Sequence, residues 1–308
     1  MIVTLTINPA IDQNVSADRL AFEDRGYILA TTESAGGRGI NASRVIHSFG
    51  GKTLAIVASG GKSGSKFEKL LEGSGFPFEV VPIQQELRTN LAISDKQGLT
   101  VKLNQAGPLM TAKELGRIER AVAAILPKAK WLMICGSIPP GVSPHFYNKL
   151  IELARSSNVH TLLDTDGYPL MHGLEARPST VTPNQQEAER LLNRALITRT
   201  HFLDAAQRIH AMGADAVLLS LGSRGAVAVN AAGSFEAIAP RVDAVCPIGA
   251  GDAMAAAYAW SMATQGDFVE AVRWGVATGT ASARLPGLAF ASLEQTREIL
   301  KHVEIRPA

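Results

Sequence analysis

Residues 131–164 of the chain read WLMICGSIPPGVSPHFYNKLIELARSSNVHTLLD. The run Trp131–Cys135 is short and apolar, which predicts a buried strand, and His160–Asp164 predicts a second one. Between them, His145–Arg155 carries apolar residues at helical spacing. Two strands joined through a helix predict a parallel β-α-β unit.

The same alternation continues on both sides of this unit. Strands are expected at Met1–Ile7, Thr53–Ala58, Thr180–Thr182 and Ala216–Leu221, with a hairpin formed by Gly225–Val229 and Ser234–Ile238. Helices are expected at Ile40–Phe49, Lys62–Glu72, Ala112–Leu126, Asn184–Leu192, His201–Met212, Gly251–Thr264, Phe268–Arg284 and Leu293–His302. The pattern predicts one doubly wound α/β domain over residues 1–308, with a mostly parallel sheet flanked by helices.

Two segments, at about residues 13–35 and 87–106, interrupt the alternation. Both are rich in β-formers without an intervening helix, and the second predicts a hairpin that turns at Asp95–Gly98. Together they are expected to form a small β-sheet over the open end of the main sheet, where ligands bind in doubly wound folds. The sheet is either a lid or surface decoration, and the sequence leaves both interpretations open.

The composition favours a globular enzyme. The chain has 308 residues, of which 46% are hydrophobic and 19% charged, and a net charge of +2. So small a charge argues against nucleic acid or an anionic membrane as a partner. Met1–Asp12 predicts a strand rather than a secretion signal, and the longest apolar stretch falls short of the about 20 residues that a bilayer span needs. Two cysteines predict a cytoplasmic setting without a disulfide framework.

The glycine-rich turn Pro247-Ile248-Gly249-Ala250-Gly251-Asp252 precedes an alanine-rich helix. Glycines at a helix start let the backbone approach a ligand, and the free N–H groups and the helix dipole favour an anion. Such groups stabilise a transferring phosphoryl group, while Asp252 could accept the proton of an attacking hydroxyl. The alternative is structural, because Asp is a favoured N-cap residue in any helix.

A second glycine cluster, Gly36–Ala42, contains a G-x-G-x-x-A pattern. A dinucleotide-binding turn of this kind is followed about 20 positions later by an acidic residue, and none is present there. Gly60-Gly61-Lys62-Ser63 resembles the end of a phosphate-binding Walker loop, but Ile56 stands where that loop begins with glycine. The cluster around Gly37 is therefore expected to approach a polar ligand instead.

Several polar residues fit phosphate or metal binding, each with a plainer alternative. Arg25, Arg38 and Arg88 could bind phosphate bidentately or be solvated surface residues. Asn184 and Glu187 share a helix face and could hold hydrated Mg²⁺, or they could form a capping box at the helix start.

Read together, seven motifs resemble the PfkB (ribokinase-like) family of sugar kinases over essentially the whole chain. Within that family, the phosphofructokinase and tagatose-phosphate kinase branch is the most similar. The motifs are Thr6–Asp12, Gly36–Asn41, Arg88–Asn90, Gly136–Val142, Pro183–Gln185, Ser220–Gly222 and Gly249–Asp252. The chain departs from the family at Arg38, where relatives show Lys or Gly, and at Cys246-Pro247-Ile248 before the glycine turn.

The resemblance implies a role for each matching residue. Substrate-binding roles fall to Asp12, Arg25, Gly37, Arg38, Gly39, Asn41, Arg88 and Ser137, with Arg88 holding a phosphate already on the sugar and Arg25 standing where a relative has a phosphate-binding lysine. ATP-binding roles fall to Asn184, Ser220, Gly222, Arg224 and Gly251. Asn184 and Glu187 would order Mg²⁺ through water, Gly249, Ala250 and Gly251 would form the anion hole, and Asp252 would be the catalytic base. The family also implies a homodimer that pairs through the small sheet.

The implied reaction is the ATP-dependent phosphorylation of a ketohexose phosphate at a primary hydroxyl. Fructose 1-phosphate and fructose 6-phosphate both give the 1,6-bisphosphate, and tagatose 6-phosphate or another sugar is the alternative substrate. A catalytically silent sugar-phosphate-binding protein is a hypothesis of a different class, since a fold does not guarantee an activity.

Overall fold

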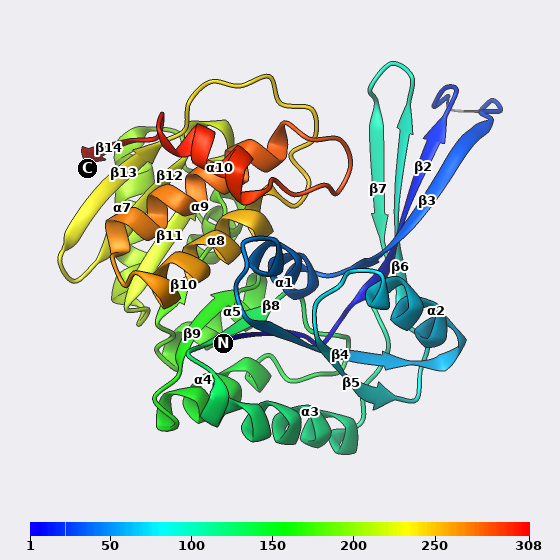
Figure 1. Ribbon diagram of the computed structural model, residues 1–308, viewed down its shortest axis with the longest axis horizontal. Helices are drawn as coiled ribbons and strands as arrows, with labels where there is room; N and C mark the ends of the chain where they lie inside the picture. Colours follow the sequence, from blue (N-terminus) through cyan, green and yellow to red (C-terminus); the bar gives the residue numbers. More distant parts are fainter. Residues whose placement is uncertain (22) are drawn as a thin grey trace.

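A sheet of ten strands forms the centre of the protein in the computed structural model, which describes residues 1–21 and 23–308 (Figure 1). Its spatial order is β14 (Glu304–Pro307), β13 (Gly233–Ile238), β12 (Ala226–Asn230), β11 (Ala216–Ser220), β10 (Thr180–Val181), β9 (His160–Asp164), β8 (Trp131–Cys135), β1 (Ile2–Thr6), β4 (Thr53–Gly60) and β5 (Phe78–Ile83). Strands from β11 to β5 pair in parallel, and β12, β13 and β14 are antiparallel. The predicted doubly wound, mostly parallel fold is confirmed.

Helices cover both faces of this sheet, because successive side chains of a strand point to opposite faces. In β8, Leu132 and Ile134 enter one core, whereas Trp131 and Met133 enter the other. The first core is closed by α3 (Ala112–Ile125), α4 (Phe146–Ser156), α5 (Gly167–Glu175), α6 (Gln185–Leu192) and α7 (Arg199–Ala211). The second is closed by α1 (Arg38–Ser48), α8 (Ala250–Thr264), α9 (Phe268–Ala283) and α10 (Leu293–Leu300).

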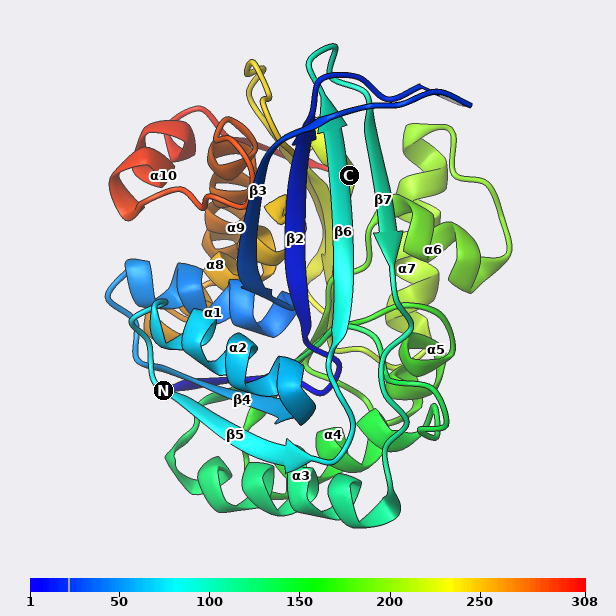
Figure 2. The same ribbon diagram turned by 90° about the vertical axis from the view of Figure 1, so that its right-hand side faces the viewer.

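The two segments outside the alternation join into one four-stranded sheet that stands away from the body (Figures 1 and 2). Its order is β3 (Ile28–Gly36), β2 (Ala10–Ala17), β6 (Arg88–Asp95) and β7 (Thr100–Asn104). Position 22, inside the first segment, lies outside the described residues. Helix α2 (Gly61–Glu72) supports the base of this small sheet through an ion pair of 2.6 Å between Lys66 and Glu33.

Three elements differ from the sequence-based expectation. Strand β5 contains Pro82 at the edge of the main sheet, and proline within an apolar run argues against a strand unless it lies at an edge. Helix α5 carries Gly167, Pro169 and Gly173, which are poor helix formers, so tertiary contacts and the Asp166 cap establish it. The terminal strand β14 was also not expected, since Glu304–Pro307 has no apolar pattern of its own. Among the described residues, no helix combines the length and the apolar character needed to cross a bilayer.

Candidate active site

The carboxyl ends of neighbouring parallel strands bring together residues that are far apart in the sequence. Asp164 ends β9, and its carbonyl accepts a hydrogen bond of 2.8 Å from the Gly136 N–H, just beyond the end of β8. Asn184 follows β10 and forms a parallel bridge with Ser220 at the end of β11. These residues therefore lie along one edge of the main sheet, the edge at which ligands bind in doubly wound folds.

The glycine turn opens helix α8, and within it the Ala250 N–H donates to the Pro247 carbonyl at 3.2 Å. Gly249 is the N-cap residue and has φ of 79°, and a Cβ there would lie 2.9 Å from Phe290. Gly251 is exposed, and a Cβ there would meet no atom within 4 Å, so space lies in front of its backbone. A helix leaves the N–H groups of its first turn without partners inside the helix. The turn is thus shaped to receive an anion at the start of α8.

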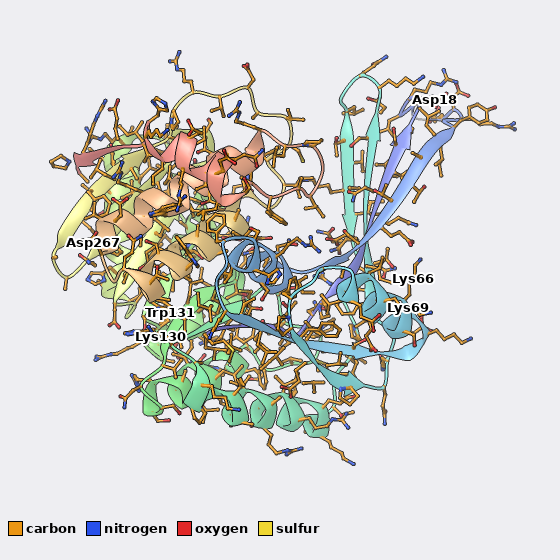
Figure 3. The ribbon with its side chains drawn as sticks, viewed as in Figure 1. Asp18, Lys66, Lys69, Lys130, Trp131 and Asp267 are labelled. Carbon is orange, nitrogen blue, oxygen red and sulfur yellow. The ribbon has the colours of Figure 1, made fainter. Side chains whose placement is uncertain are left out.

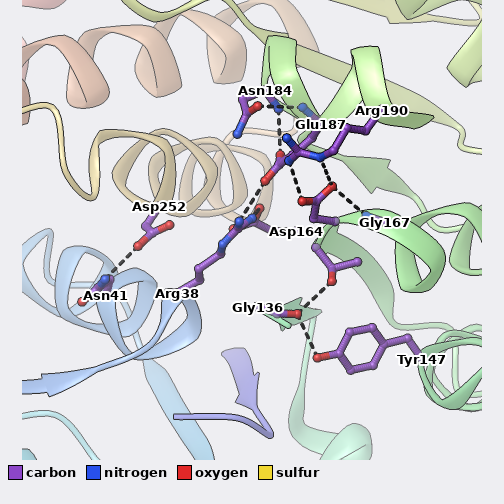
Figure 4. Close-up of polar contacts among 12 residues, drawn as sticks. Arg38, Asn41, Gly136, Tyr147, Asp164, Gly167, Asn184, Glu187, Arg190 and Asp252 are labelled. Carbon is purple, nitrogen blue, oxygen red and sulfur yellow. Dashed lines mark hydrogen bonds and ion pairs between the residues drawn. The ribbon is translucent and has the colours of Figure 1, made fainter. Parts of the chain in front are cut away.

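Asp252 lies in the first turn of α8 and does not cap it. The N-cap is Gly249 and no side-chain cap bond is present, so the capping alternative for Asp252 is wrong. Its Oδ2 instead accepts a hydrogen bond of 2.7 Å from Asn41 Nδ2 of α1 (Figure 4). Burial, followed by repulsion from Asp164, raises the pKa of Asp252 to about 7, although the Arg38 charge and the Asn41 bond act in the opposite direction.

Arg38 joins two carboxylates that lie on the opposite side of the site from the small sheet. Its Nη1 contacts Asp164 Oδ1 and its Nη2 contacts Glu187 Oε1, both at 2.8 Å (Figure 4). The Asp164 and Glu187 side chains are buried, whereas Arg38 keeps 35% exposure. The structure therefore places Arg38 beside the residues expected to hold nucleotide and metal, while its neighbour Asn41 reaches Asp252.

Asn184 and Glu187 form a reciprocal capping box at the start of α6. Glu187 N–H donates to Asn184 Oδ1, and Asn184 N–H donates to Glu187 Oε2, each at 2.9 Å. The capping box that the sequence offered as the alternative to a metal site is therefore present. It is compatible with a role in ordering a hydrated cation, because Asp164, Glu187 and Asp252 place three carboxylates around the single Arg38 charge.

A cavity of about 840 Å³ adjoins the glycine turn and contains every residue expected to bind ATP. These are Asn184, Ser220, Gly222, Arg224 and Gly251. Its apolar wall comes from Val242, Met254 and Val276. A cavity of this size, lined by both polar and apolar groups, fits a nucleotide-sized ligand.

The small sheet lies on the side of Asp252 opposite the cavity, and polar side chains of this sheet face the site. Asn90 Nδ2 of β6 donates to Asp12 Oδ1 of β2 at 2.8 Å, and burial raises the pKa of Asp12. A Cβ on Gly36 would lie 2.1 Å from the Asp12 carboxylate, so a side chain at that position would displace this carboxylate. The side-chain oxygens of Asn8, Asn41 and Asn90 are buried and have no partner among the described residues. Such acceptors suit the hydroxyl groups of a ligand.

Arg88 lies at the base of the small sheet. Its Nε donates to the Asn8 carbonyl at 3.2 Å and its Nη1 to the Gln105 carbonyl at 3.0 Å. The Asp12 charge favours its ionised form, although burial lowers the pKa of Arg88 overall. The guanidinium is thereby held at the junction of the two sheets, close to the polar face that carries Asp12.

Other expected site residues have different surroundings. Gly37 and Gly39 allow α1 to pack against the end of β1, since a Cβ on either would meet the Thr6 side chain. Ser137 Oγ accepts from Asn8 Nδ2 at 3.1 Å, which places it beside the sugar-side amides. Arg25 lies in the loop between β2 and β3, where its N–H donates to Asp24 Oδ1 at 2.7 Å and its carbonyl accepts from Arg19 Nε at 3.2 Å. This loop begins at Asp18, which Figure 3 labels at the outer end of β2. Arg25 is separated from Arg88, which pairs with Ala10, by about 20 Å of strand, so one chain does not bring the two arginines together.

Comparison with known proteins identifies the family of the chain. Residues 5–296 match the pfkB family of carbohydrate kinases. The chain belongs to this family. It is 31% identical to the ATP-dependent 6-phosphofructokinase isozyme 2 of Escherichia coli over 98% of both chains, and 27% identical to a tagatose-6-phosphate kinase of Staphylococcus epidermidis over 99% of both. The crystal structure of the E. coli phosphofructokinase-2 in complex with fructose-6-phosphate superposes with a TM-score of 0.90 at 30% identity, covering 98% of each chain.

Some site residues of this carbohydrate kinase were not among the sequence-based candidates. Arg44 of α1 is partly buried and close enough to Asp12 for their charges to interact. Its position three residues after Asn41, on the same helix face, is the sequence signal that could have identified it. The cavity wall from Pro240 to Asp243 carries no motif, so only the folded chain identifies it.

Proposed function

We propose that this kinase transfers the γ-phosphoryl group of ATP to a primary hydroxyl of a ketohexose phosphate, with fructose 6-phosphate as the preferred acceptor. The observation that carries the proposal is the position of Asp252. Its carboxylate lies between the nucleotide-sized cavity and the unpartnered amide oxygens of the small-sheet side, and its pKa is raised to about 7. The names of the relatives with 31% and 27% identity support phosphorylated ketohexoses as the substrate class.

The chemistry follows from the two sides of Asp252. Asp252 accepts the proton of the C1 hydroxyl as that oxygen forms a bond to the γ-phosphorus, and the bond from phosphorus to the bridging oxygen of ADP breaks. The N–H groups of Gly249 and Gly251 and the dipole of α8 stabilise the charge on the transferring group. Asn41 holds the Asp252 carboxylate in place through its 2.7 Å bond. The product is the 1,6-bisphosphate.

Magnesium fits the nucleotide side of the site through bound water. Both oxygens of Glu187 already accept hydrogen bonds, one from Arg38 and one from Asn184 N–H, so water is the natural intermediary between this pair and a cation. When bound with ATP, the ion would neutralise phosphate charge. The Arg38 guanidinium neutralises part of the charge of the Asp164 and Glu187 carboxylates, and its ion pair keeps Glu187 oriented.

The 6-phosphate would bind at Arg88, which carries a partly exposed guanidinium at the junction of the sheets. Asp12 and the amides of Asn41 and Asn90 would accept hydrogen bonds from the sugar hydroxyls. An unphosphorylated sugar would offer no phosphate for the Arg88 guanidinium to bind. This supports a sugar phosphate over ribose or a nucleoside.

Turnover across a panel of acceptors tests the proposal. ADP release is measured with fructose 6-phosphate, fructose 1-phosphate, tagatose 6-phosphate, ribose and adenosine, and the bisphosphate product is identified by mass. We expect the highest kcat/KM with fructose 6-phosphate. Activity confined to ribose or adenosine would overturn the assignment of Arg88, and no phosphoryl transfer to any acceptor would support a silent binding protein.

The raised pKa of Asp252 predicts the acid limb of the pH profile. The free carboxyl keeps its proton up to about pH 7, and a base must be deprotonated to accept one. We therefore expect kcat/KM to fall about tenfold per pH unit below the pKa of Asp252. The measurement is kcat/KM for the sugar phosphate from pH 5 to 9, with ATP saturating. A kcat/KM that stays constant down to pH 5, as expected if the base titrated like an ordinary Asp near about pH 4, would contradict the assignment.

Removing the Arg38 charge is expected to destabilise the protein and to shift the acid limb of the pH profile of kcat/KM. In Arg38→Met, two buried carboxylates lose their shared partner, which costs about 1–3 kcal/mol, less than for a fully buried pair because Arg38 is 35% exposed. Because Arg38 lowers the pKa of Asp252, the acid limb should move to higher pH. Chemical denaturation and the pH profile provide the two measurements, with Arg38→Lys as the charge-preserving control. An unmoved limb in Arg38→Met would show that the charge does not act on Asp252.

We also propose that the small sheet acts as a lid and pairs with the lid of a second copy. Side chains alternate across it, so Asp12 and Asn90 face the site while Leu91, Ile93 and Leu103 lie on the opposite face. Leu103 is 56% exposed. An apolar face on an open four-stranded sheet favours association with another copy.

Leu103→Glu is expected to convert the dimer into monomers, because it places a charge in that apolar face. Light scattering after size-exclusion chromatography gives the mass directly. Lys102→Glu changes the charge of the neighbouring residue on the other face and should leave the dimer intact. Equal masses for wild type and Leu103→Glu would place the interface elsewhere.

A further inference from the structure

We propose that His145, His172 and Glu175 form a binding site for a transition-metal dication of the zinc class, separate from the phosphoryl-transfer site. Among the described residues, these three offer ligand atoms that all lie within 4.8 Å of one another. They come from two helices that meet on the face of the main sheet opposite α8. His145 is the N-cap residue of α4, and His172 and Glu175 lie in the last turn of α5.

The two imidazole rings are already close. Their centroids are 3.9 Å apart with an angle of 38° between the ring planes, and His172 Nδ1 lies 3.1 Å from Glu175 Oε1. Ligands that share one tetrahedral zinc ion lie about 3.3 Å apart. A rotation of the exposed His145 side chain toward His172 would bring the ligand atoms to this spacing. The Glu175 side chain is also exposed and can rotate toward the same point.

The backbone beneath the cluster is fixed, which distinguishes it from a chance meeting of surface side chains. Asn148 Nδ2 of α4 donates to the His172 carbonyl of α5 at 2.8 Å, and this bond holds the two helices in register. His145 N–H donates to Ser143 Oγ, which fixes the residue at the start of α4. Two residues of one helix at i and i+3 share a face, so His172 and Glu175 present their ligand atoms together.

The chemistry of the ligands selects the class of ion. Imidazole binds zinc, nickel, cobalt and copper, whereas magnesium prefers oxygen ligands and keeps its water. Two imidazoles and one carboxylate leave a fourth position open to water or to an anion. The bound ion would join α4 to α5. It would thereby stabilise the segment after β9, where Asp166 caps α5 and accepts from Arg190 of α6.

Zinc binding to the untagged protein tests the site in the presence of excess Mg²⁺, which occupies oxygen-rich sites. All proteins carry Cys246→Ser, so the partly exposed thiol does not contribute. We expect one Zn²⁺ per chain by calorimetry, and a cobalt complex whose visible absorption shows nitrogen and oxygen ligands without a thiolate band. His145→Ala and His172→Ala should each weaken zinc binding at least about tenfold, since even an outer partner of a metal ligand contributes that much.

His47→Ala is the matched control, because His47 is an exposed histidine at the end of α1, apart from the cluster. It should bind zinc as the parent does. Zinc should raise the unfolding temperature of the parent and of His47→Ala, but not that of His172→Ala. Glu175→Gln keeps the helix and serves if either alanine variant does not fold. Unchanged zinc affinity in the cluster variants, or the absence of a zinc-dependent shift in the parent, overturns the proposal.

Discussion

Asp252→Asn is expected to lower kcat by about a hundredfold or more, the scale of a lost general base. The amide keeps the size of the side chain and can still accept from Asn41 Nδ2, so the first turn of α8 should be unchanged. Binding of ATP and of the sugar phosphate should persist, because neither depends on the Asp252 charge. Turnover is measured by coupled ADP release and binding by calorimetry.

The stability of this variant gives an independent measure of the raised pKa. In the unfolded chain Asp252 has a pKa of 3.8, and in the folded protein it has a pKa of about 7. Between these values the folded state holds the proton more tightly, so wild-type stability falls as pH rises through this range. Asp252→Asn lacks this loss and should unfold at an equal or higher temperature than wild type at pH 8.

Asp215→Asn is the matched control for both effects, since Asp215 is exposed and lies before β11, outside the site. Its turnover and its unfolding temperature should remain those of the wild type. Near-wild-type turnover in Asp252→Asn would exclude Asp252 as the base. Lost binding of both substrates would instead show that its charge serves to organise the site.

Arg88→Gln is expected to raise KM for the sugar phosphate by about ten- to a hundredfold, the range of one or two charge-assisted hydrogen bonds. The value of kcat should change much less, because the phosphate that Arg88 holds is remote from the transferring group. Activity with unphosphorylated fructose should be nearly unaffected. Initial rates with fructose 6-phosphate and with fructose separate these effects.

Two further variants locate the phosphate contact. Lys96→Gln removes an exposed charge at the tip of the hairpin between β6 and β7 and should leave KM unchanged. Arg25→Gln has a more specific expectation: because Arg25 is at the outer end of the small sheet, it can affect KM only through a second copy. A raised KM for Arg25→Gln that disappears in the Leu103→Glu background would link the lid interface to substrate binding. An equal KM for the sugar phosphate in wild type and in Arg88→Gln would show that Arg88 does not bind the phosphate.

Much of the fold follows from local patterns in the chain. Buried strands such as Trp131–Cys135 are short apolar runs, and amphipathic helices such as Ala112–Ile125 carry the helical period. Parallel order follows from the alternation of the two. The family motifs carry the same kind of information, because each needs only a few adjacent residues. Elements without a periodic apolar pattern, such as β5 and α5, were not predicted, because contacts with neighbouring strands and helices stabilise them.

The chain itself determined that Gly249, Gly251 and Asp252 stand at the start of a helix, since glycines and a following alanine-rich run are local features. Only the tertiary structure decided what Asp252 does there. Its contact with Asn41 spans 211 residues, and its pKa depends on Asp164 and Arg38, which other elements supply. The same holds for Arg38, whose two carboxylate partners are 126 and 149 residues away. The pKa of a buried group depends on its distances to other charges. The sequence therefore shows which ionisable groups are present, whereas the fold determines their pKa values.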